Sequence, residues 1–240
     1  MGIDRGASVA QMAGMDALPL RFETPVTLVG GGALDRAALD EARRHAPVLI
    51  AADAGADRLA EFRLAPRAVI GDMDSITDPG RWRDGPAAFL HLAEQETTDF
   101  EKCLYATEAP LYLAVGFTGR RTDHTLAVFH AMLRHAHKRV VVIGTDEVAA
   151  LAPAGRRLRL ALTPGVRVSV HPLLPVQASY SRGLAWPLAG EELAPGRRIG
   201  TSNEATAPVV EMTFVGPGAL VLLERTALAT LIAALSNPAR

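Results

Sequence analysis

The chain has 240 residues, of which 49% are apolar, and its 25 basic and 26 acidic side chains leave a formal net charge of −1. A charge this close to zero creates no strong field toward nucleic acid or a membrane surface. No apolar run approaches the ~20 residues that a membrane span needs. Cys103 is the single cysteine, so an internal disulfide is excluded and a reducing compartment is compatible. We therefore expect a cytoplasmic protein with no nucleic-acid or membrane partner.

Residues 1–24 mix Gly, Ala, Met and Asp without a clear period. The segment lacks the sustained apolar stretch of a signal peptide. We interpret it as a flexible leader and leave it out of the fold argument.

From Val26 on, short apolar runs alternate with helical patterns. The pattern predicts strands at 26–29, 48–52, 68–70, 111–115 and 140–143, and helices at 34–45, 56–62, 99–107 and 123–137. Continuous rather than alternating apolar strands indicate burial on both faces, as in a parallel sheet covered by helices. The carboxyl ends of such strands share one edge, where open α/β sheets bind ligands. The chain is therefore predicted to be α/β, with a mostly parallel N-terminal sheet flanked by helices.

The pattern changes after about residue 147. Short strands with Pro and Gly punctuation are predicted at 158–162, 166–170, 177–180, 209–214 and 219–223, followed by a terminal helix at 226–235. This texture is typical of a small antiparallel β-domain. We expect an α/β domain over residues 25–147 and a β-domain over residues 148–240.

Two carboxylates, Asp72 and Asp74, directly follow the predicted strand 68–70. Alternate residues of an extended chain point the same way, so these groups would repel each other. A cation removes that repulsion, and Mg²⁺ is usually held by one or two carboxylates plus substrate phosphates. The alternative is a solvated turn in which Ser75 caps the next segment.

A second motif, Thr98-Asp99-x-x-Lys102, places Asp99 and Lys102 on one face of a predicted helix. Asp99 in the first turn suits the helix dipole, and a lysine suits a phosphate chain as a point charge. The alternative is an ordinary i,i+3 surface ion pair. Together with Asp72 and Asp74, this motif indicates phosphoryl-type transfer from a nucleotide.

Three further segments end predicted strands with glycine and polar residues. The run 30–32 is Gly-Gly-Gly, which lets backbone approach phosphate or simply makes a tight turn. Asp53 is a candidate ligand for a nucleotide hydroxyl or a metal-bound water, or a helix N-cap. The loop 116–124 carries Arg121, Asp123 and His124. Its arginines could neutralise phosphate charge. The alternative is that the arginines are solvated, Asp123 caps the next helix and His124 is a packed residue of its first turn.

These motifs, taken in order, resemble the thiamine pyrophosphokinase (thiamine diphosphokinase) family. The match covers about residues 26 to 224 and includes segments 52–57, 71–75, 95–102, 121–124, 186–188 and 200–204. The resemblance implies that the C-terminal domain is an antiparallel β-sandwich and that the chain forms a homodimer with shared active sites. It also implies an enzyme that uses ATP and Mg²⁺ to transfer pyrophosphate to the hydroxyl of thiamine, giving thiamine diphosphate and AMP.

The resemblance also assigns roles to individual residues. The Mg²⁺ ligands would be Asp72, Asp74 and Asp99, and the catalytic set would add Lys102, Arg121 and Asp123. The ATP side would be Gly31, Gly32, Asp53, Gly55, Thr98 and His124, and the thiamine side would be Gln95, Trp186, Ser202 and Asn203. Without the resemblance, Trp186 would be read as a core residue and Ser202-Asn203 as a turn.

The sequence departs from the family pattern at two places. The segment 53–57 is Asp-Ala-Gly-Ala-Asp where the family often has Asp-Gly-Gly-Ala-Asn, and Ala54 is a mild change if the backbone there is ordinary. Arg120 stands where the family commonly has Gly; it would fail at a positive φ or could add a phosphate contact.

Other functions stay open at this point. One is a diphosphokinase for another hydroxymethyl heterocycle, such as a pterin, and another is a non-catalytic thiamine- or nucleotide-sensing module. A dinucleotide oxidoreductase is disfavoured because the glycine run lacks the G-x-G-x-x-G spacing.

Overall fold

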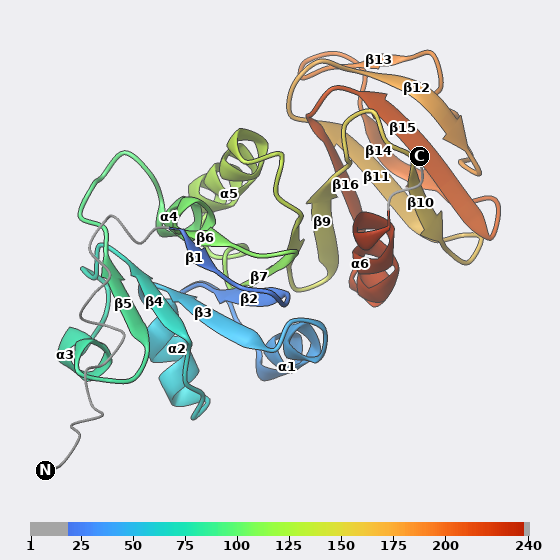
Figure 1. Ribbon diagram of the computed structural model, residues 1–240. Helices are drawn as coiled ribbons and strands as arrows, with labels where there is room; N and C mark the ends of the chain where they lie inside the picture. The colour runs from blue at the N-terminus through green and yellow to red at the C-terminus, as the bar shows by residue number, and fades with distance from the viewer. Residues whose placement is uncertain (1–18, 238–240) are drawn as a thin grey trace, which may run out of the picture. The chain divides into compact units, whose positions relative to one another are not determined.

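The computed structural model describes residues 19–237, and the chain divides into two compact units between Val128 and Phe129 (Figure 1). Within the described range, none of the helices has the length and apolar character needed to cross a bilayer. Most of the predicted leader, residues 1–24, lies outside the described residues. Its end contributes β1 (Leu20–Arg21), which pairs in parallel with β6 (Thr107–Glu108).

Unit 1 is built on a parallel sheet, as predicted. Its strands are β2 (Val26–Val29), β3 (Val48–Ala52), β4 (Ala68–Gly71), β5 (Ala88–His91) and β7 (Tyr112–Val115). They lie in the order β7-β2-β3-β4-β5, and each neighbouring pair is parallel. Every residue of β2, β4 and β7 is buried, because helices cover both faces of the sheet.

The helices follow from right-handed crossovers between these strands. Unit 1 contains α1 (Arg36–His45), α2 (Gly55–Glu61), α3 (Pro79–Arg83) and α4 (Asp99–Ala106), and α5 (Thr122–Arg134) begins there. The steps β2 to β3 to β4 to β5 all run in one direction, which places α1, α2 and α3 on one face. The return from β5 to β7 reverses direction and places α4 on the other face (Figure 1).

The order of the strands therefore reverses between β2 and β7, the type of position where open α/β sheets bind ligands. The chain leaves β2 toward α1 on one face, and it leaves β7 toward α5 on the other. The chain thus leads from these two strands to opposite faces of the sheet, and a cavity lies at this carboxyl edge.

Side-chain caps explain several helix starts. Asp35 accepts a hydrogen bond from the Ala38 amide, so α1 begins at Arg36 rather than at the predicted residue 34. Thr98 caps α4 in the same way, and Asp99 lies in the first turn as expected. The capping alternative for Asp53 is wrong, because Ala54 holds the N-cap position of α2 without a side-chain cap. Asp78, not Ser75, caps the short α3.

Unit 2 contains two antiparallel sheets, in agreement with the predicted class. One follows the order β8-β9-β16-β11-β14, and the other follows β10-β15-β12-β13. The strands are β8 (Val140–Ile143), β9 (Glu147–Leu151), β10 (Leu158–Ala161), β11 (Arg167–Pro172), β12 (Val176–Arg182), β13 (Glu192–Leu193), β14 (Gly200–Glu204), β15 (Val209–Val215) and β16 (Ala219–Glu224). Alternating burial along β10, β11 and β15 gives each sheet an apolar inner face. A 3₁₀ turn (Arg225–Ala227) leads into α6 (Leu228–Ser236).

The boundary between the compact units, after Val128, differs from residue 147, where the sequence pattern changes from helix-and-strand alternation to short strands. β8 pairs antiparallel with β9 and so belongs to the sheet of unit 2, although its apolar run resembles the parallel strands before it. The functional division at residue 147 stays a prediction. The predicted helix over 123–137 ends earlier, at Arg134, and its apolar spacing does not ensure burial, since Leu126 is 63% exposed.

Candidate functional site

A cavity of about 850 Å³ lies in unit 1 at the carboxyl ends of β2, β3, β4 and β7. It gathers most of the residues predicted for the site from segments far apart in the sequence. These are Gly31, Gly32, Asp53, Asp72, Asp74, Gln95, Thr98, Asp99, Lys102, Arg121 and His124. Asp123 and Gly55 do not line it, and Trp186, Ser202 and Asn203 lie in unit 2.

One wall of the cavity is formed by two glycine-containing loops in close contact. The Gly32 amide donates to the Gly116 carbonyl at 2.8 Å. A Cβ added at Gly30 or at Gly32 would lie 2.5 Å from that same carbonyl oxygen. Only glycine allows the two backbones to approach this closely. The loops after β2 and β7 are thereby held together, and glycine backbone forms part of the cavity wall beside Phe117.

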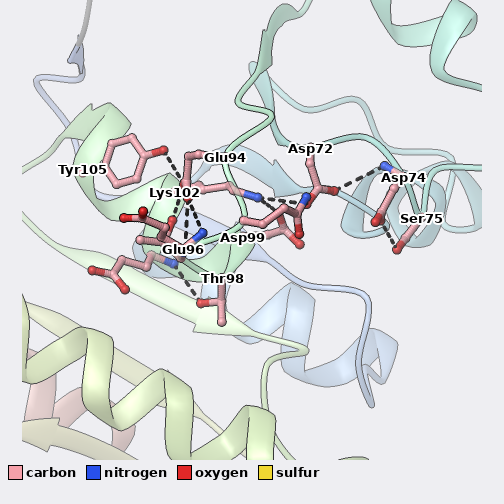
Figure 2. Close-up of polar contacts among 12 residues, drawn as sticks. Asp72, Asp74, Ser75, Glu94, Glu96, Thr98, Asp99, Lys102 and Tyr105 are labelled. Carbon is pink, nitrogen blue, oxygen red and sulfur yellow. Dashed lines mark hydrogen bonds and ion pairs between the residues drawn. The ribbon is translucent and has the colours of Figure 1, made fainter.

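Lys102 is the centre of the polar side of the cavity (Figure 2). Its side chain is 1% exposed, and Nζ lies 3.0 Å from Asp72 Oδ2 and 3.3 Å from Asp99 Oδ1. Burial acts to lower the pKa of Lys102, but the hydrogen bond and charge of Asp72 and the charge of Asp99 outweigh it and raise that pKa. The ammonium therefore stays charged inside the protein. The surface ion-pair alternative for Asp99 and Lys102 is wrong.

Asp72 is held in its ionised form by several donors. Its Oδ2 accepts from Lys102 and, at 3.0 Å, from Gln95 Nε2, while its Oδ1 accepts from the Asp74 amide at 3.3 Å. Burial opposes ionisation, but the hydrogen bonds from Lys102, Asp74 and Gln95 prevail and lower the pKa of Asp72.

Asp53 is buried beside this pair, with 3% of its surface exposed. Its Oδ1 has no hydrogen-bond partner, and its backbone adopts a φ of 44°, a conformation that Asp tolerates at some cost. Burial, then the charge of Asp99, raises the pKa of Asp53. Burial also raises the pKa of Asp99, although Lys102 counteracts it.

Carboxylate oxygens of Asp53, Asp72 and Asp99 all lie within 4.8 Å of one another. Gly71 makes this approach possible, since a Cβ there would lie 2.8 Å from the Cβ of Asp53 and 3.1 Å from Asp99 Oδ1. Three carboxylates this close, one of them with a buried unpaired oxygen, fit a hard divalent cation.

Asp74 is not part of this close group. β4 ends at Gly71, and Met73 adopts a φ of 65°, so the chain turns between Asp72 and Asp74 instead of continuing as a strand. The expectation that the two carboxylates point the same way is therefore wrong. Asp74 Oδ1 accepts from Ser75 Oγ at 2.8 Å, and its role as a metal ligand stays a prediction.

The loop after β7 brings cationic groups to the cavity. Arg121 forms a two-point contact with Asp123, at 3.1 Å from Nε and 2.6 Å from Nη2, and both side chains are 64% exposed. The hydrogen bond and charge of Asp123 raise the pKa of Arg121. Asp123 lies in the first turn of α5, which begins at Thr122, and its carboxylate is directed to Arg121.

Both departures from the family pattern are compatible with the backbone. Ala54 has ordinary helical angles, with φ −54° and ψ −12°. Gly119 has the positive φ, 96°, and Arg120 does not, so Arg120 fits its position and lines the cavity. Gly55 has a packing role, because a Cβ there would lie 1.9 Å from the Val29 carbonyl oxygen.

In unit 2, Trp186 is 60% exposed and borders a hollow of about 210 Å³ together with Asn203. Asn203 is buried and fixes the loop: its Oδ1 accepts from the Trp186 amide at 3.1 Å, and its Nδ2 donates to the Trp186 carbonyl at 2.7 Å. The core interpretation of Trp186 is wrong. Ser202 does not line this hollow; it has a φ of 57°, and its amide donates to Ser169 Oγ.

Sequence reasoning missed the aromatic residues of the cavity. Phe100 from α4 and Phe117 from the loop after β7 both line it and meet edge to face, with ring centroids 4.9 Å apart. The available signal was the position of Phe117 in the loop that follows a predicted strand, since the carboxyl ends of the strands hold the site.

Comparisons with known proteins point to one family. Residues 39–143 match the family described as "Thiamin pyrophosphokinase, catalytic domain". Thiamine pyrophosphokinase 1 of Arabidopsis thaliana is 27% identical over 195 residues, which cover 66% of this chain and 71% of the relative.

Over residues 39–143 the chain is therefore similar to the thiamine pyrophosphokinase catalytic domain. The resemblance and the expectation of a thiamine diphosphokinase enzyme are thereby confirmed. Solved structures share the fold: thiamin pyrophosphokinase from Geobacillus thermodenitrificans has a TM-score of 0.70 at 20% identity, covering 87% of this chain and 100% of that one. The yeast enzyme has a TM-score of 0.68 at 15% identity, covering 90% and 95%. The matched segment contains every residue of the cavity except the glycine run 30–32.

Replacing Lys102 by Met should destabilise the protein in a pH-dependent way. In the wild type, the lowered pKa of Asp72 adds stability that is present above its unfolded pKa and is lost as pH falls through the folded pKa. The variant leaves Asp72 and Asp99 without their cation, at a cost of about 2–3 kcal/mol near neutral pH. The difference from wild type in urea unfolding should shrink below pH ~4. Arg36→Met, which breaks the exposed pair with Asp40, is the control; an equal loss for both variants would contradict a special role for Lys102.

Proposed function

We propose that this protein transfers the diphosphoryl group of ATP to the hydroxyl of thiamine, giving thiamine diphosphate and AMP. The observation that carries the proposal is the buried Lys102 among Asp53, Asp72 and Asp99, in a cavity walled by glycine backbone, within a segment that matches the family's catalytic domain. This combination suits a polyphosphate with its counter-cation. The cytoplasmic location expected from the sequence stays a prediction.

The glycine loops and cationic groups support ATP binding in this cavity. Its volume of about 850 Å³ lies in the range of small-molecule sites. Backbone along Gly31 and Gly32 allows phosphates to approach closely, and Lys102 and Arg121 supply positive charge to them. The contact of Arg121 with Asp123 would then be exchanged for phosphate, because both groups are exposed.

We propose that Asp53, Asp72 and Asp99 hold a Mg²⁺ ion, with Asp74 as the alternative third ligand. The unpaired Oδ1 of Asp53 and the raised pKa values of Asp53 and Asp99 support this set, since a cation would offset the cost of ionising buried carboxylates. When bound, the ion would neutralise charge on the ATP phosphates.

The protein's part in the reaction is mainly positioning and electrostatics. The thiamine hydroxyl oxygen forms a bond to the β-phosphorus, and the bond from that phosphorus to the oxygen of the α-phosphate breaks, so AMP leaves. Lys102 and Arg121 stabilise the negative charge of the transferring group. The hydroxyl proton passes to one of the carboxylates in the cavity.

We propose that thiamine contacts Gln95 on one side and Trp186 on the other, in a homodimer whose partner copy supplies Trp186. The exposed indole face of Trp186 suits a cationic thiazolium ring. Asn203 keeps the Trp186 backbone in place, and Ser202 directly precedes Asn203 in the sequence.

The proposed reaction predicts thiamine-dependent release of AMP from ATP and Mg²⁺ that is lost on adding EDTA. Asp72→Asn should lower turnover by about 100-fold or more, because Asp72 orients both Lys102 and the cation. Asp84→Asn, which changes an exposed aspartate outside the cavity, is the matched control. Release of AMP only with a pterin alcohol would identify a pterin, not thiamine, as the acceptor. Thiamine binding without any release of AMP would favour a sensing module.

Metal binding can be tested without turnover, by the melting temperature in Mg²⁺ and in EDTA. Mg²⁺ at ten times its Kd should raise the wild-type melting temperature by about 3 °C or more, and Asp53→Asn should abolish this rise. Because burial raises the pKa of Asp53 in the folded protein, stability is lost as pH rises from the unfolded pKa of this carboxyl to its folded pKa, so Asp53→Asn should melt higher than wild type in EDTA at pH 7. A rise that survives in Asp53→Asn but disappears in Asp74→Asn would assign the third ligand to Asp74.

A shared site predicts complementation between two inactive variants. Asp72→Asn chains mixed with Trp186→Ala chains, after unfolding and refolding together, should recover about a quarter of wild-type activity, because half the random pairs are mixed and each has one complete site. Mixing Asp72→Asn with Asp99→Asn is the control and should recover none. No recovery in the first mixture would place Trp186 outside a site shared between copies.

A further inference from the structure

The carboxylate of Glu94 is the hub of a hydrogen-bond network that the proposed reaction does not use (Figure 2). Its Oε2 accepts from the amides of Glu96 and Thr97, at 2.8 and 3.0 Å. Its Oε1 accepts from the Thr97 hydroxyl and, at 3.0 Å, from the Tyr105 hydroxyl. One side chain therefore collects four donors.

These contacts close the loop between β5 and α4 onto the helix itself. Glu94 stands near the start of the loop, whereas Tyr105 lies in the second turn of α4. Between them the loop carries Gln95, which donates to Asp72 Oδ2, and Thr98, which caps α4. The same helix supplies Asp99 and Lys102. The network thus links the loop to the element that carries the site's charged centre.

The tip of the loop lies at the surface. Residues 93–96 are exposed, and exposed loops are mobile unless tied down. The hydroxyl of Thr97 lowers the pKa of Glu94; burial opposes this, and the hydroxyl of Tyr105 and the amides of Thr97 and Glu96 lower the pKa further. Burial, then Glu94, raises the pKa of Tyr105 to about 12. Glu94 is therefore an ionised acceptor and Tyr105 a protonated donor around neutral pH.

We propose that Glu94 and Tyr105 form a clasp that positions Gln95 in the cavity and thereby tunes binding of the acceptor alcohol. Neither residue lines the cavity, so both are positioning residues that act through Gln95. The proposal rests on the proposed function for the identity of the acceptor. The clasp itself is a property of the free protein and can be measured without any substrate.

The first test is hydrogen exchange of the loop amides in the free protein. Glu94→Ala should speed exchange at Glu96 and Thr97 by about 10-fold or more, because it removes charge-assisted acceptors. Tyr105→Phe, which deletes one hydroxyl, should have a smaller effect. Glu94→Gln should largely restore protection, since its carbonyl can accept from the amides while its amide donates to the hydroxyls. Glu96→Ala removes the neighbouring carboxylate of the loop and is the control.

The second test separates KM from kcat for the two substrates. Glu94→Ala should raise KM for thiamine by about 10-fold and KM for ATP by less than about 3-fold, with Glu94→Gln close to wild type. A purely structural defect would lower the active fraction and leave both KM values unchanged.

Unchanged exchange in Glu94→Ala overturns the clasp, whatever the activity. Faster exchange with an unchanged KM for thiamine overturns the positioning role. If exchange is faster in Glu94→Ala than in the wild type but the wild type never releases AMP, the proposed function is refuted and the clasp is still supported.

Discussion

The structure of the site depends on one buried charge. The ammonium of Lys102 is almost fully enclosed, and it is stable there because Asp72 and Asp99 lie 3.0 and 3.3 Å away. This pairing joins the turn after β4 to the first turns of α4. Glu94 and Gln95 are placed relative to the same point, since the loop that carries them leads directly into α4, the helix that contains Tyr105.

The sheet provides the frame for this charge. Parallel strands buried on both faces place their carboxyl ends at one edge, and the reversal of strand order between β2 and β7 opens a crevice there. The contact between the loops of Gly32 and Gly116 then brings glycine backbone to one wall of the cavity. The cluster of one ammonium and three carboxylates thus shares the cavity with glycine backbone. This arrangement suits a charged phosphate chain and its cation.

Much of the fold could be predicted because the signals are local. The runs at 26–29, 48–52 and 140–143 match β2, β3 and β8, since a buried strand must be continuously apolar. The short α3, the edge strand β5 and the polar β14 gave no such signal. In the site, Asp53, Asp72 and Asp99 lie together, whereas the predicted carboxylates Asp74 and Asp123 lie outside this group. The chain turns at Met73, so the extended geometry on which the pairing of Asp72 with Asp74 was based is absent.

The sequence by itself determined the class of fold, the family resemblance and most of the residues at the edge of the sheet, because element types and short motifs are encoded by neighbours in the chain. The tertiary structure decided which of them meet. Lys102 and Asp72 are 30 residues apart, and the approach of Asp53 to Asp99 requires the absence of a side chain at Gly71. The role of Glu94 also became visible only in the tertiary structure, since its contact partner Tyr105 lies 11 residues away in the sequence. Such contacts depend on how strands and helices pack in three dimensions, which local spacing does not specify.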